Sequence, residues 1–166
     1  MPKNVFITGA NGGFGRLTTS SLLAAGHTVV ATMRNIDTRN LAAANELRAA
    51  GARVVELDVT DDGSVDAAMA DAVELAGSID VVINNAGVGS IGLLETFTPA
   101  DWQASFDINV FGVQRVNRAA LPHMRAQGSG LLVIVSSVVG RMALPFFGPY
   151  NAAKFAVEGL AETYRS

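Results

Sequence analysis

The sequence predicts an α/β fold with a doubly wound, parallel β-sheet in a single domain spanning residues 1–166. Three observations support this prediction. Short apolar runs rich in Val and Ile alternate with longer stretches of helical pattern. A glycine-rich turn joins the first run to the first helical stretch, and four of the helical stretches end at a glycine. Alternating strands and helices of this kind form parallel sheets with right-handed crossovers and helices on both faces.

Each predicted strand is a short run in which nearly every side chain is apolar. Parallel strands are covered by helices on both faces, so they read as continuous apolar runs rather than as alternating ones. The predicted strands are Val5–Thr8, Thr28–Met33, Arg53–Leu57, Val81–Asn84 and Leu131–Ser136. The expected spatial order is 3-2-1-4-5, which places the last strand at one edge of the sheet.

The predicted helices follow the strands along the chain. Glycine comes directly after four of them, and glycine readily takes the left-handed backbone conformation that ends a helix. Trp102 and Phe106 are four residues apart, which indicates packing on a helix rather than ligand binding. The predicted helices are Phe14–Ala25, Leu41–Ala50, Asp62–Ala76, Val110–Gln127 and Tyr150–Arg165.

The composition narrows the class of protein. Apolar residues make up 49% and charged residues 16%, which is typical of a globular chain. A net charge of -3 without a basic stretch argues against nucleic-acid binding.

Cysteine is absent, so disulfides and thiolate metal sites are excluded and a cytoplasmic location is expected. We expect no membrane contact, because no apolar run approaches about 20 residues. We expect no metal site, because His27 and His123 lack ligand partners at suitable spacing.

A glycine-rich turn, Thr8–Gly15, follows the first predicted strand and opens the first helix. Glycines let the backbone turn tightly and approach a pyrophosphate, which then faces the free N–H groups of the helix. Gly9, Gly13 and Gly15 fit the spacing G-x-x-x-G-x-G, which resembles the single-domain branch of the short-chain dehydrogenase/reductase family. Gly9, Gly12 and Gly15 also fit G-x-x-G-x-x-G, which resembles the extended branch with its epimerases and dehydratases. The turn alone therefore predicts a dinucleotide site and leaves the branch open.

Arg34 follows the second predicted strand, where the adenosine ribose of a dinucleotide is expected. A cofactor without a 2′-phosphate favours a carboxylate here, but no acidic residue occurs between Gly15 and Asp37. The guanidinium can instead pair with a 2′-phosphate through charge-assisted hydrogen bonds. The sequence therefore favours NADP(H), and NAD(H) stays possible because Asp37 can serve a ribose.

The fourth predicted strand ends in the motif Asn84, Asn85, Ala86 and Gly87. Two amides and a glycine at a strand end can order a turn and reach the ribose of a cofactor. The motif resembles the single-domain branch, and the extended branch usually lacks it. The motif therefore favours the single-domain branch.

Four polar residues match the catalytic set of that branch. Tyr150 and Lys154 are four residues apart, so they share one face of the last predicted helix. Ser137 follows the fifth predicted strand and precedes Tyr150 by 13 residues, which is the spacing of the family, whereas the adjacent Ser136 does not fit it. Asn109, at the start of the long predicted helix, matches the fourth member. Their joint occurrence on the expected elements indicates a catalytic site.

The resemblance implies a role for each residue. Tyr150 would move the hydroxyl proton, because hydride transfer between an alcohol carbon and nicotinamide leaves that proton to be transferred separately. Lys154 would stabilise the phenolate and hold the nicotinamide ribose, and Ser137 would donate to the substrate oxygen. Asn109 would order a water that relays protons. The resemblance also implies a set of cofactor-binding residues, in which Asp58 and Val59 would contact the adenine from the end of the third strand. The set is Gly9, Asn11, Gly13, Phe14, Gly15, Arg34, Asp58, Val59, Asn85, Ala86, Gly87, Tyr150 and Lys154.

The sequence thus predicts an NADP(H)-dependent oxidoreductase for alcohols or carbonyl compounds. The segment 140–150 resembles members that act on apolar substrates such as steroids and retinoids. Two alternatives stay open, a dinucleotide-binding regulator without turnover and, less favoured, an epimerase or dehydratase of the extended branch. Only 16 residues follow Tyr150, whereas family members continue with further strands. We therefore expect the chain to lack the C-terminal part of the family fold, and the complete protein to be a homodimer or homotetramer.

Overall fold

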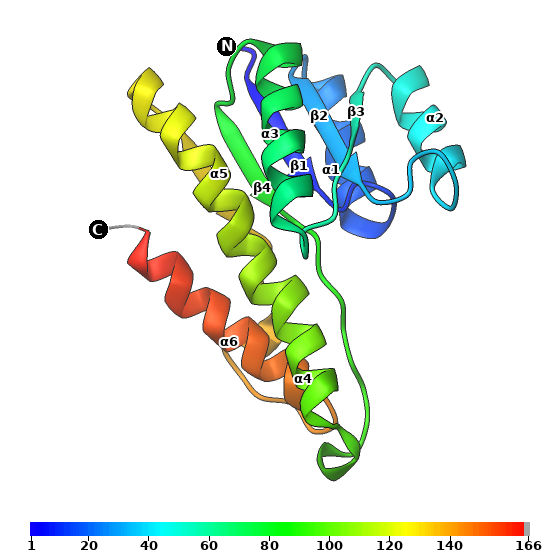
Figure 1. Cartoon of the computed structure of the whole chain (residues 1–166), viewed down its shortest axis with the longest axis vertical. Helices are drawn as coiled ribbons and strands as arrows, with labels where there is room; N and C mark the ends of the chain where they lie inside the picture. Colours follow the sequence, from blue (N-terminus) through cyan, green and yellow to red (C-terminus); the bar gives the residue numbers. More distant parts are fainter. Residues whose placement is uncertain (165–166) are drawn as a thin grey trace.

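The computed structural model describes residues 1–164 and places one five-stranded sheet between two layers of helices (Figure 1). All neighbouring strands are parallel, and their order is β3-β2-β1-β4-β5, which confirms the predicted fold class. Because every strand runs the same way, all carboxyl ends lie along one edge of the sheet. The strands are β1 (Asn4–Thr8), β2 (Thr28–Met33), β3 (Arg53–Glu56), β4 (Val81–Asn84) and β5 (Leu131–Ile134).

β3 and β5 end before the predicted Leu57 and Ser136. In each case the backbone stays hydrogen-bonded to the adjacent strand for one further residue. The Leu57 N–H donates to the Met33 carbonyl (3.0 Å), and the Val135 N–H donates to the Asn84 carbonyl (2.9 Å). Beyond these bonds the chain leaves the sheet and enters the loops at its carboxyl edge.

Two apolar cores attach the helices to the two faces of the sheet. On one face α3 (Asp62–Ala76) and α5 (Gly112–Gln127) share a buried cluster with Phe6 of β1. On the other face α2 (Leu41–Ala49) shares a second cluster with Ile7 of β1, and α1 (Gly13–Ala24) packs against that cluster. β1 and β2 are therefore buried on both faces, which explains their continuous apolar runs.

The long helix predicted from Val110 was wrong at its N-terminal end. Helical backbone already begins with α4 (Pro99–Phe106), passes through a π-helical segment, η2 (Asp107–Phe111), and continues as α5. The local signal is a capping box. The Thr98 hydroxyl accepts from the Asp101 N–H, and the Asp101 carboxylate accepts from the Thr98 N–H (2.8 Å). A proline at the first helical position completes this start signal.

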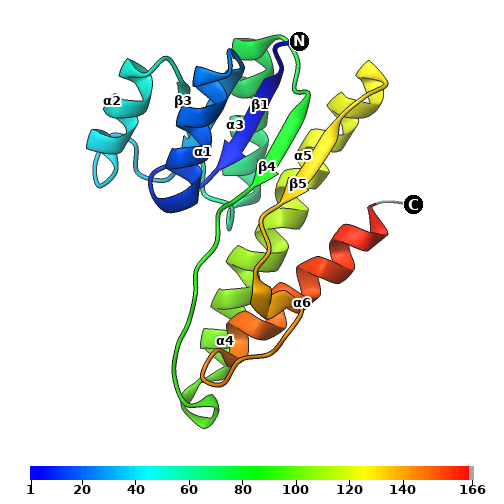
Figure 2. The same ribbon diagram turned by 180° about the vertical axis from the view of Figure 1, so that it is seen from behind.

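α6 (Gly148–Thr163) starts two residues before the predicted Tyr150, and the predicted end at Arg165 lies outside the described residues. α6 packs against α4, η2 and a single turn, η3 (Val138–Gly140). Another single turn, η1 (Leu94–Thr96), lies between β4 and α4. Figure 2 shows α4, the start of α5 and α6 extending beyond the carboxyl edge of the sheet. No helix within residues 1–164 is long and apolar enough to cross a membrane.

Candidate active site

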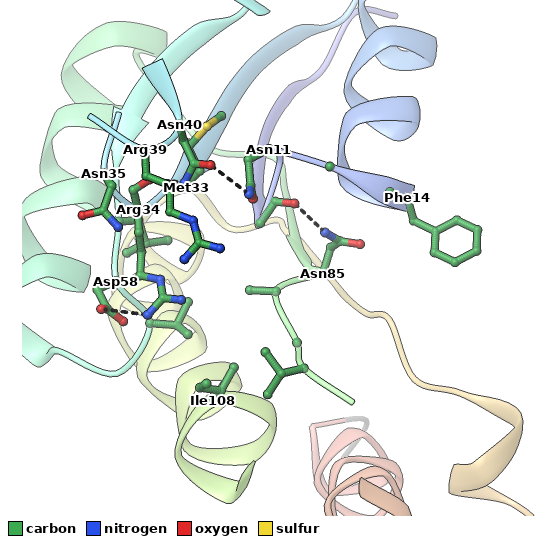
Figure 3. Close-up of a pocket in the computed structure, with 18 residues that line it drawn as sticks. Asn11, Phe14, Met33, Arg34, Asn35, Arg39, Asn40, Asp58, Asn85 and Ile108 are labelled. Atoms are coloured by element: carbon green, nitrogen blue, oxygen red, sulfur yellow. Dashed lines mark hydrogen bonds and ion pairs between the residues drawn. The ribbon is translucent and has the colours of Figure 1, made fainter. Parts of the chain in front are cut away.

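A cavity of about 480 Å³ opens at the carboxyl ends of β1, β2, β3 and β4 (Figure 3). The cavity lies beside β1, which has β2 on one side and β4 on the other. Doubly wound sheets bind ligands at the strand where the chain changes sides in this way. Gly15, Tyr150 and Lys154 do not line it. Ten of the predicted cofactor-binding residues do line it, namely Gly9, Asn11, Gly13, Phe14, Arg34, Asp58, Val59, Asn85, Ala86 and Gly87.

The glycine-rich turn forms one wall of the cavity and leaves the N-terminus of α1 open. Gly12 is the N-cap of α1 in extended backbone (φ -169°), and no side chain caps the N–H groups of the first turn. That turn also has no acidic side chain, and Phe14 is 77% exposed. Unsatisfied N–H groups at a helix N-terminus attract anions. The turn therefore fits the pyrophosphate of a dinucleotide.

Gly15 contributes to this turn by its small size rather than by lining the cavity. A Cβ atom at Gly15 would lie 2.6 Å from Asn85 Nδ2 and 2.9 Å from the carbonyl carbon of Gly9. Gly9 has a φ of 67°, in the left-handed region, and a Cβ atom there would lie 2.9 Å from Ala86 Cα. Both glycines therefore let the turn pack directly against the segment that follows β4.

Hydrogen bonds join the glycine-rich turn to the segment after β4. Asn85 Nδ2 donates to the carbonyls of Thr8 (2.9 Å) and Gly9 (3.1 Å). The Thr8 hydroxyl accepts from the N–H groups of Asn85 (3.1 Å) and Ala86 (2.9 Å). The second asparagine of the predicted motif thus holds two walls of the cavity together.

Arg34 and Asp58 meet at the β2–β3 end of the cavity, where a guanidinium nitrogen and a carboxylate oxygen are 3.5 Å apart (Figure 3). Thr60 donates to the Asp58 carboxylate from its N–H (2.9 Å) and its hydroxyl (2.7 Å). Burial raises the pKa of Asp58, but the Thr60 hydrogen bonds and the Arg34 charge outweigh burial, so the pKa lies below its ordinary value. Asp37, the alternative partner for a ribose, is exposed and does not line the cavity.

Tyr150 and Lys154 lie together on α6, with Lys154 Nζ 5.6 Å from the centre of the Tyr150 ring. Lys154 is only 6% exposed, and its Nζ donates to the Val135 carbonyl just beyond β5 (2.8 Å). Burial lowers the pKa of the Lys154 ammonium. An ammonium has three N–H donors, so Val135 leaves two of them for a ligand.

Asn109 is 1% exposed and lies in the π-helical segment η2 rather than in a regular helix. Its Oδ1 accepts from the Val88 N–H (3.1 Å), and its Nδ2 donates to the carbonyls of Val88 (3.0 Å) and Ser105 (2.9 Å). The side chain thus fixes the segment after β4 to the α4–η2 junction. Single π-helical turns inside helices are frequent at functional sites.

Ser137 is the N-cap of η3, and its hydroxyl accepts from the Val139 N–H (3.3 Å). Ser136 Oγ has no hydrogen-bond partner among residues 1–164 and lines a second cavity of about 800 Å³ between α5, β5 and α6. The backbone at Ser137 is extended, and neighbouring residues in extended backbone point in opposite directions. The two serine side chains therefore have different surroundings.

Gly87 connects the first cavity to the predicted catalytic residues. It lines the cavity, and a Cβ atom there would lie 2.9 Å from Asn109 Oδ1 and 3.8 Å from Lys154 Nζ. α6 also packs against both η2 and η3. These contacts bring Asn109, Ser137, Tyr150 and Lys154 to one edge of the sheet, beside the cavity.

The part of the cavity wall between β2 and α2 was not predicted from the sequence. That loop is shaped by a distant side chain, because the Glu56 carboxylate accepts from the N–H groups of Asn35 (2.6 Å) and Ile36 (2.9 Å). A second basic residue in the loop, Arg39, was an available signal, but no local pattern predicts which way such a loop folds. The lining residues not predicted are Gly12, Met33, Asn35, Arg39, Asn40, Leu57, Val88 and Ile108.

Comparison with known proteins points to one family. The sequence profile described as short chain dehydrogenase matches residues 3–166. The 3-ketodihydrosphingosine reductase of Bacteroides thetaiotaomicron is 38% identical over 161 residues, which cover 97% of this chain and 56% of that protein. The chain spans about half the length of the curated relatives it matches.

Two solved structures share the fold of this chain. A short-chain dehydrogenase from Burkholderia phymatum in complex with NAD has a TM-score of 0.89 and 36% identity, over 98% of this chain and 59% of that one. A gluconate 5-dehydrogenase from Burkholderia cenocepacia in complex with NADP and tartrate has a TM-score of 0.86 and 33% identity, over 95% of this chain and 62% of that one. With the profile match over nearly all of its length, the chain belongs to the short-chain dehydrogenase/reductase family.

Proposed function

We propose that this chain forms the dinucleotide-binding and catalytic part of an NADP(H)-dependent oxidoreductase that interconverts alcohols and carbonyl compounds. When bound, the nicotinamide supplies or accepts the hydride. The observation that carries the proposal is the buried Lys154 beside Tyr150, at the Gly87 end of the cavity. Burial of an ammonium carries a desolvation cost, and charged side chains buried at such a cost cluster at functional sites.

Each side chain of the site has a task in this proposal. Tyr150 moves the hydroxyl proton, and the Lys154 ammonium stabilises the phenolate and binds ribose hydroxyls with its two remaining donors. Ser137 donates to the substrate oxygen and stabilises the charge that develops there. Asn109 Oδ1 accepts one protein hydrogen bond of the two that an amide oxygen can accept, which leaves one for a water that relays protons.

The cofactor that we infer is NADP(H). Arg34 lies in the cavity wall at the end of β2, where the adenosine ribose is expected, and a guanidinium binds phosphate through paired charge-assisted hydrogen bonds. Among residues 1–164, Asp58 is the only residue with a carboxylate that lines the cavity, and it is already engaged by Arg34 and Thr60. We assign the glycine-rich turn to the pyrophosphate, Asp58 and Val59 to the adenine, and the segment after β4 to the nicotinamide ribose.

The substrate that we infer is apolar. The segments that follow β4 and β5 meet where the Gly92 N–H donates to the Phe146 carbonyl (2.9 Å). Their large side chains are exposed, with Ile91 at 73%, Met142 at 55% and Phe146 at 58%. Exposed apolar side chains that gather on one surface are typical of sites that bind apolar ligands. The name of the relative 3-ketodihydrosphingosine reductase supports a carbonyl compound as the substrate.

Tyr150→Phe tests the catalytic assignment. In the whole protein that contains this chain, the variant is expected to keep its NADPH affinity, measured by fluorescence titration. Its NADPH oxidation with a panel of apolar ketones, followed by absorbance, is expected to fall about 10²–10⁴-fold because a general acid is lost. Tyr164→Phe is the matched control, since Tyr164 ends α6 and bonds Gln114 instead.

Near-normal turnover of Tyr150→Phe would refute the role of the tyrosine. Binding of NADPH by the wild-type protein without turnover of any carbonyl compound would favour a dinucleotide-binding regulator.

A further inference from the structure

The Arg115 guanidinium joins α5 to three other segments near the cavity. The side chain is only 21% exposed. Its Nη1 donates to the carbonyls of Val59 (3.2 Å) and Asp107 (3.3 Å), and its Nη2 lies 2.7 Å from a carboxylate oxygen of Asp107. Its Nε lies 3.5 Å from the carboxylate of Asp62 at the start of α3. Arg115 thus connects α5 to the loop after β3, to α3 and to η2.

The contacts with Asp107 hold the π-helical turn η2. The Gly112 N–H donates to the Asp107 carbonyl, and this bond spans the five residues that are typical of a π-helix. Arg115 donates to the same carbonyl, and its charge-assisted contact with the carboxylate fixes the side chain of Asp107 as well. Arg115 therefore binds both the backbone and the side chain of the first residue of η2.

η2 carries two residues that belong to the site. Ile108 lines the cavity, whereas the next residue, Asn109, bonds Val88 and Ser105. Hydrogen bonds of a π-helix span five residues instead of four, so relaxation of η2 to an α-helix would turn these side chains around the helix axis. The π-helical form of the turn therefore sets the direction of the Asn109 side chain.

The contact with Val59 holds the wall that we assign to the adenine. Val59 lines the cavity and is buried. Its carbonyl accepts from Arg115, and a Cβ atom at Gly112 would lie 2.9 Å from Val59 Cγ2. The adenine wall therefore packs against the first turn of α5, directly after η2.

We propose that Arg115 is a positioning residue that fixes Asn109 relative to the adenine wall. This inference rests on the proposed function, in which Asn109 orders the water that relays protons. Arg115 does not line the cavity, so it acts through Val59 and Asn109 rather than on the cofactor or the substrate. A guanidinium suits this task, because its N–H donors form a rigid planar fork that binds several acceptors in fixed directions.

The experiment measures both ends of the site in the whole protein that contains this chain. Calorimetric titration with adenosine 2′,5′-bisphosphate, which lacks the nicotinamide half, reports on the adenine wall. The kcat of NADPH oxidation with an apolar ketone reports on Asn109. Arg115→Gln is expected to weaken binding of the bisphosphate about 10-fold, because a charged hydrogen bond to the wall is lost. The kcat is expected to fall about 10- to 100-fold, because small displacements of active-site groups have effects of this size.

Two further variants separate the contacts of Arg115. Asp107→Ala removes the carboxylate on η2 and keeps the hydrogen bond to Val59, so it is expected to lower kcat about 10-fold and to leave the Kd of the bisphosphate unchanged. Arg118→Gln is the matched control. Arg118 bonds Asp62, as Arg115 does, but within residues 1–164 it contacts neither Val59 nor Asp107, so neither kcat nor Kd is expected to change.

A double-mutant cycle shows whether Arg115 acts through Asn109. Arg115→Gln is expected to change kcat by no more than about 2-fold when Asn109→Ala is already present, because the group that it positions is absent. Binding of the bisphosphate shows that each variant is folded. Should Arg115→Gln not fold, the cycle is made with Asp107→Ala, for which the same result is expected.

The outcomes separate this inference from the proposed function. Effects of the two changes on kcat that multiply overturn the inference and leave the proposed function standing. The same holds for an Arg115→Gln protein that melts at a lower temperature but keeps its kcat, or that keeps the wild-type Kd of the bisphosphate. A wild-type protein that binds the bisphosphate but turns over no carbonyl compound overturns the proposed function, and the inference with it.

Discussion

At the scale of single residues, Gly12 and Gly15 belong to the same turn but have different surroundings. A Cβ atom at Gly15 meets backbone of Gly9 and the side chain of Asn85, whereas at Gly12 it meets nothing within 4 Å. Gly15→Ala is therefore expected to lower the free energy of unfolding by about 1–3 kcal/mol, the usual cost of overpacking. Gly12→Ala is expected to change it by less than about 0.5 kcal/mol, because its backbone is extended and any residue adopts it.

Urea denaturation of the two variants and the wild type, at one pH and temperature, measures this difference. Equal stability of Gly15→Ala and Gly12→Ala would show that the turn relaxes freely around an added methyl group.

At the scale of elements, α4 depends on its capping box. The Thr98 side chain and the Asp101 carboxylate satisfy N–H groups that the helix leaves free at its start. Thr98→Ala is expected to lower the free energy of unfolding by about 1 kcal/mol. Thr38→Ala is the control, because Thr38 is exposed and its hydroxyl makes no hydrogen bond within residues 1–164.

The capping box also predicts a pH dependence. Hydrogen bonds from Thr98 lower the pKa of Asp101 below 3.8, so the folded state favours the ionised carboxylate. This contribution is fully present above pH 3.8 and is lost as the pH falls through the pKa of the folded state. The stability difference between wild type and Thr98→Ala, from thermal unfolding, is therefore expected to be constant down to about pH 5 and to shrink below pH 3.8. A difference that grows with acidity would contradict this account.

At the scale of the whole molecule, β5 is an edge strand within residues 1–164, since its one neighbour in the sheet is β4. Leu131 at its start is 54% exposed, and the second cavity runs along the same edge. Open apolar edges pair with other chains. The purified 166-residue chain is therefore expected to self-associate, with an average mass above 17.2 kDa that rises with concentration.

Sedimentation velocity of two lysine variants tests this prediction. Leu131→Lys is expected to reduce the association, because a charge on an edge strand opposes pairing. Leu17→Lys is the control, because Leu17 is 66% exposed on α1, away from β5. A monomer at every concentration, or an equal effect of the two variants, would contradict an edge-to-edge contact.

The parts of the fold that sequence predicts well are those that depend on local periodicity. β2 and α3 occupy the predicted ranges, and β4 does as well. The prediction failed around Asn109, because a capping box at Thr98 starts the helix earlier and a π-helical turn interrupts it. The apolar periodicity of a helix does not reveal a π-helical turn. Such a turn depends on contacts with distant parts of the chain, here α6 and the segment after β4.

The sequence by itself determined the parallel sheet, the glycine-rich turn and the order of Ser137, Tyr150 and Lys154 along the chain. These features appear in the sequence as continuous apolar runs and as fixed spacings between residues. Only the tertiary structure decided that the Asp58 carboxylate pairs with the Arg34 guanidinium. The pair joins the residue after β2 to a residue that follows β3, and these segments approach each other because of the register of the sheet. Charge balance in the cavity is therefore a property of the folded chain, because Coulomb interactions depend on distance in space rather than on separation in sequence.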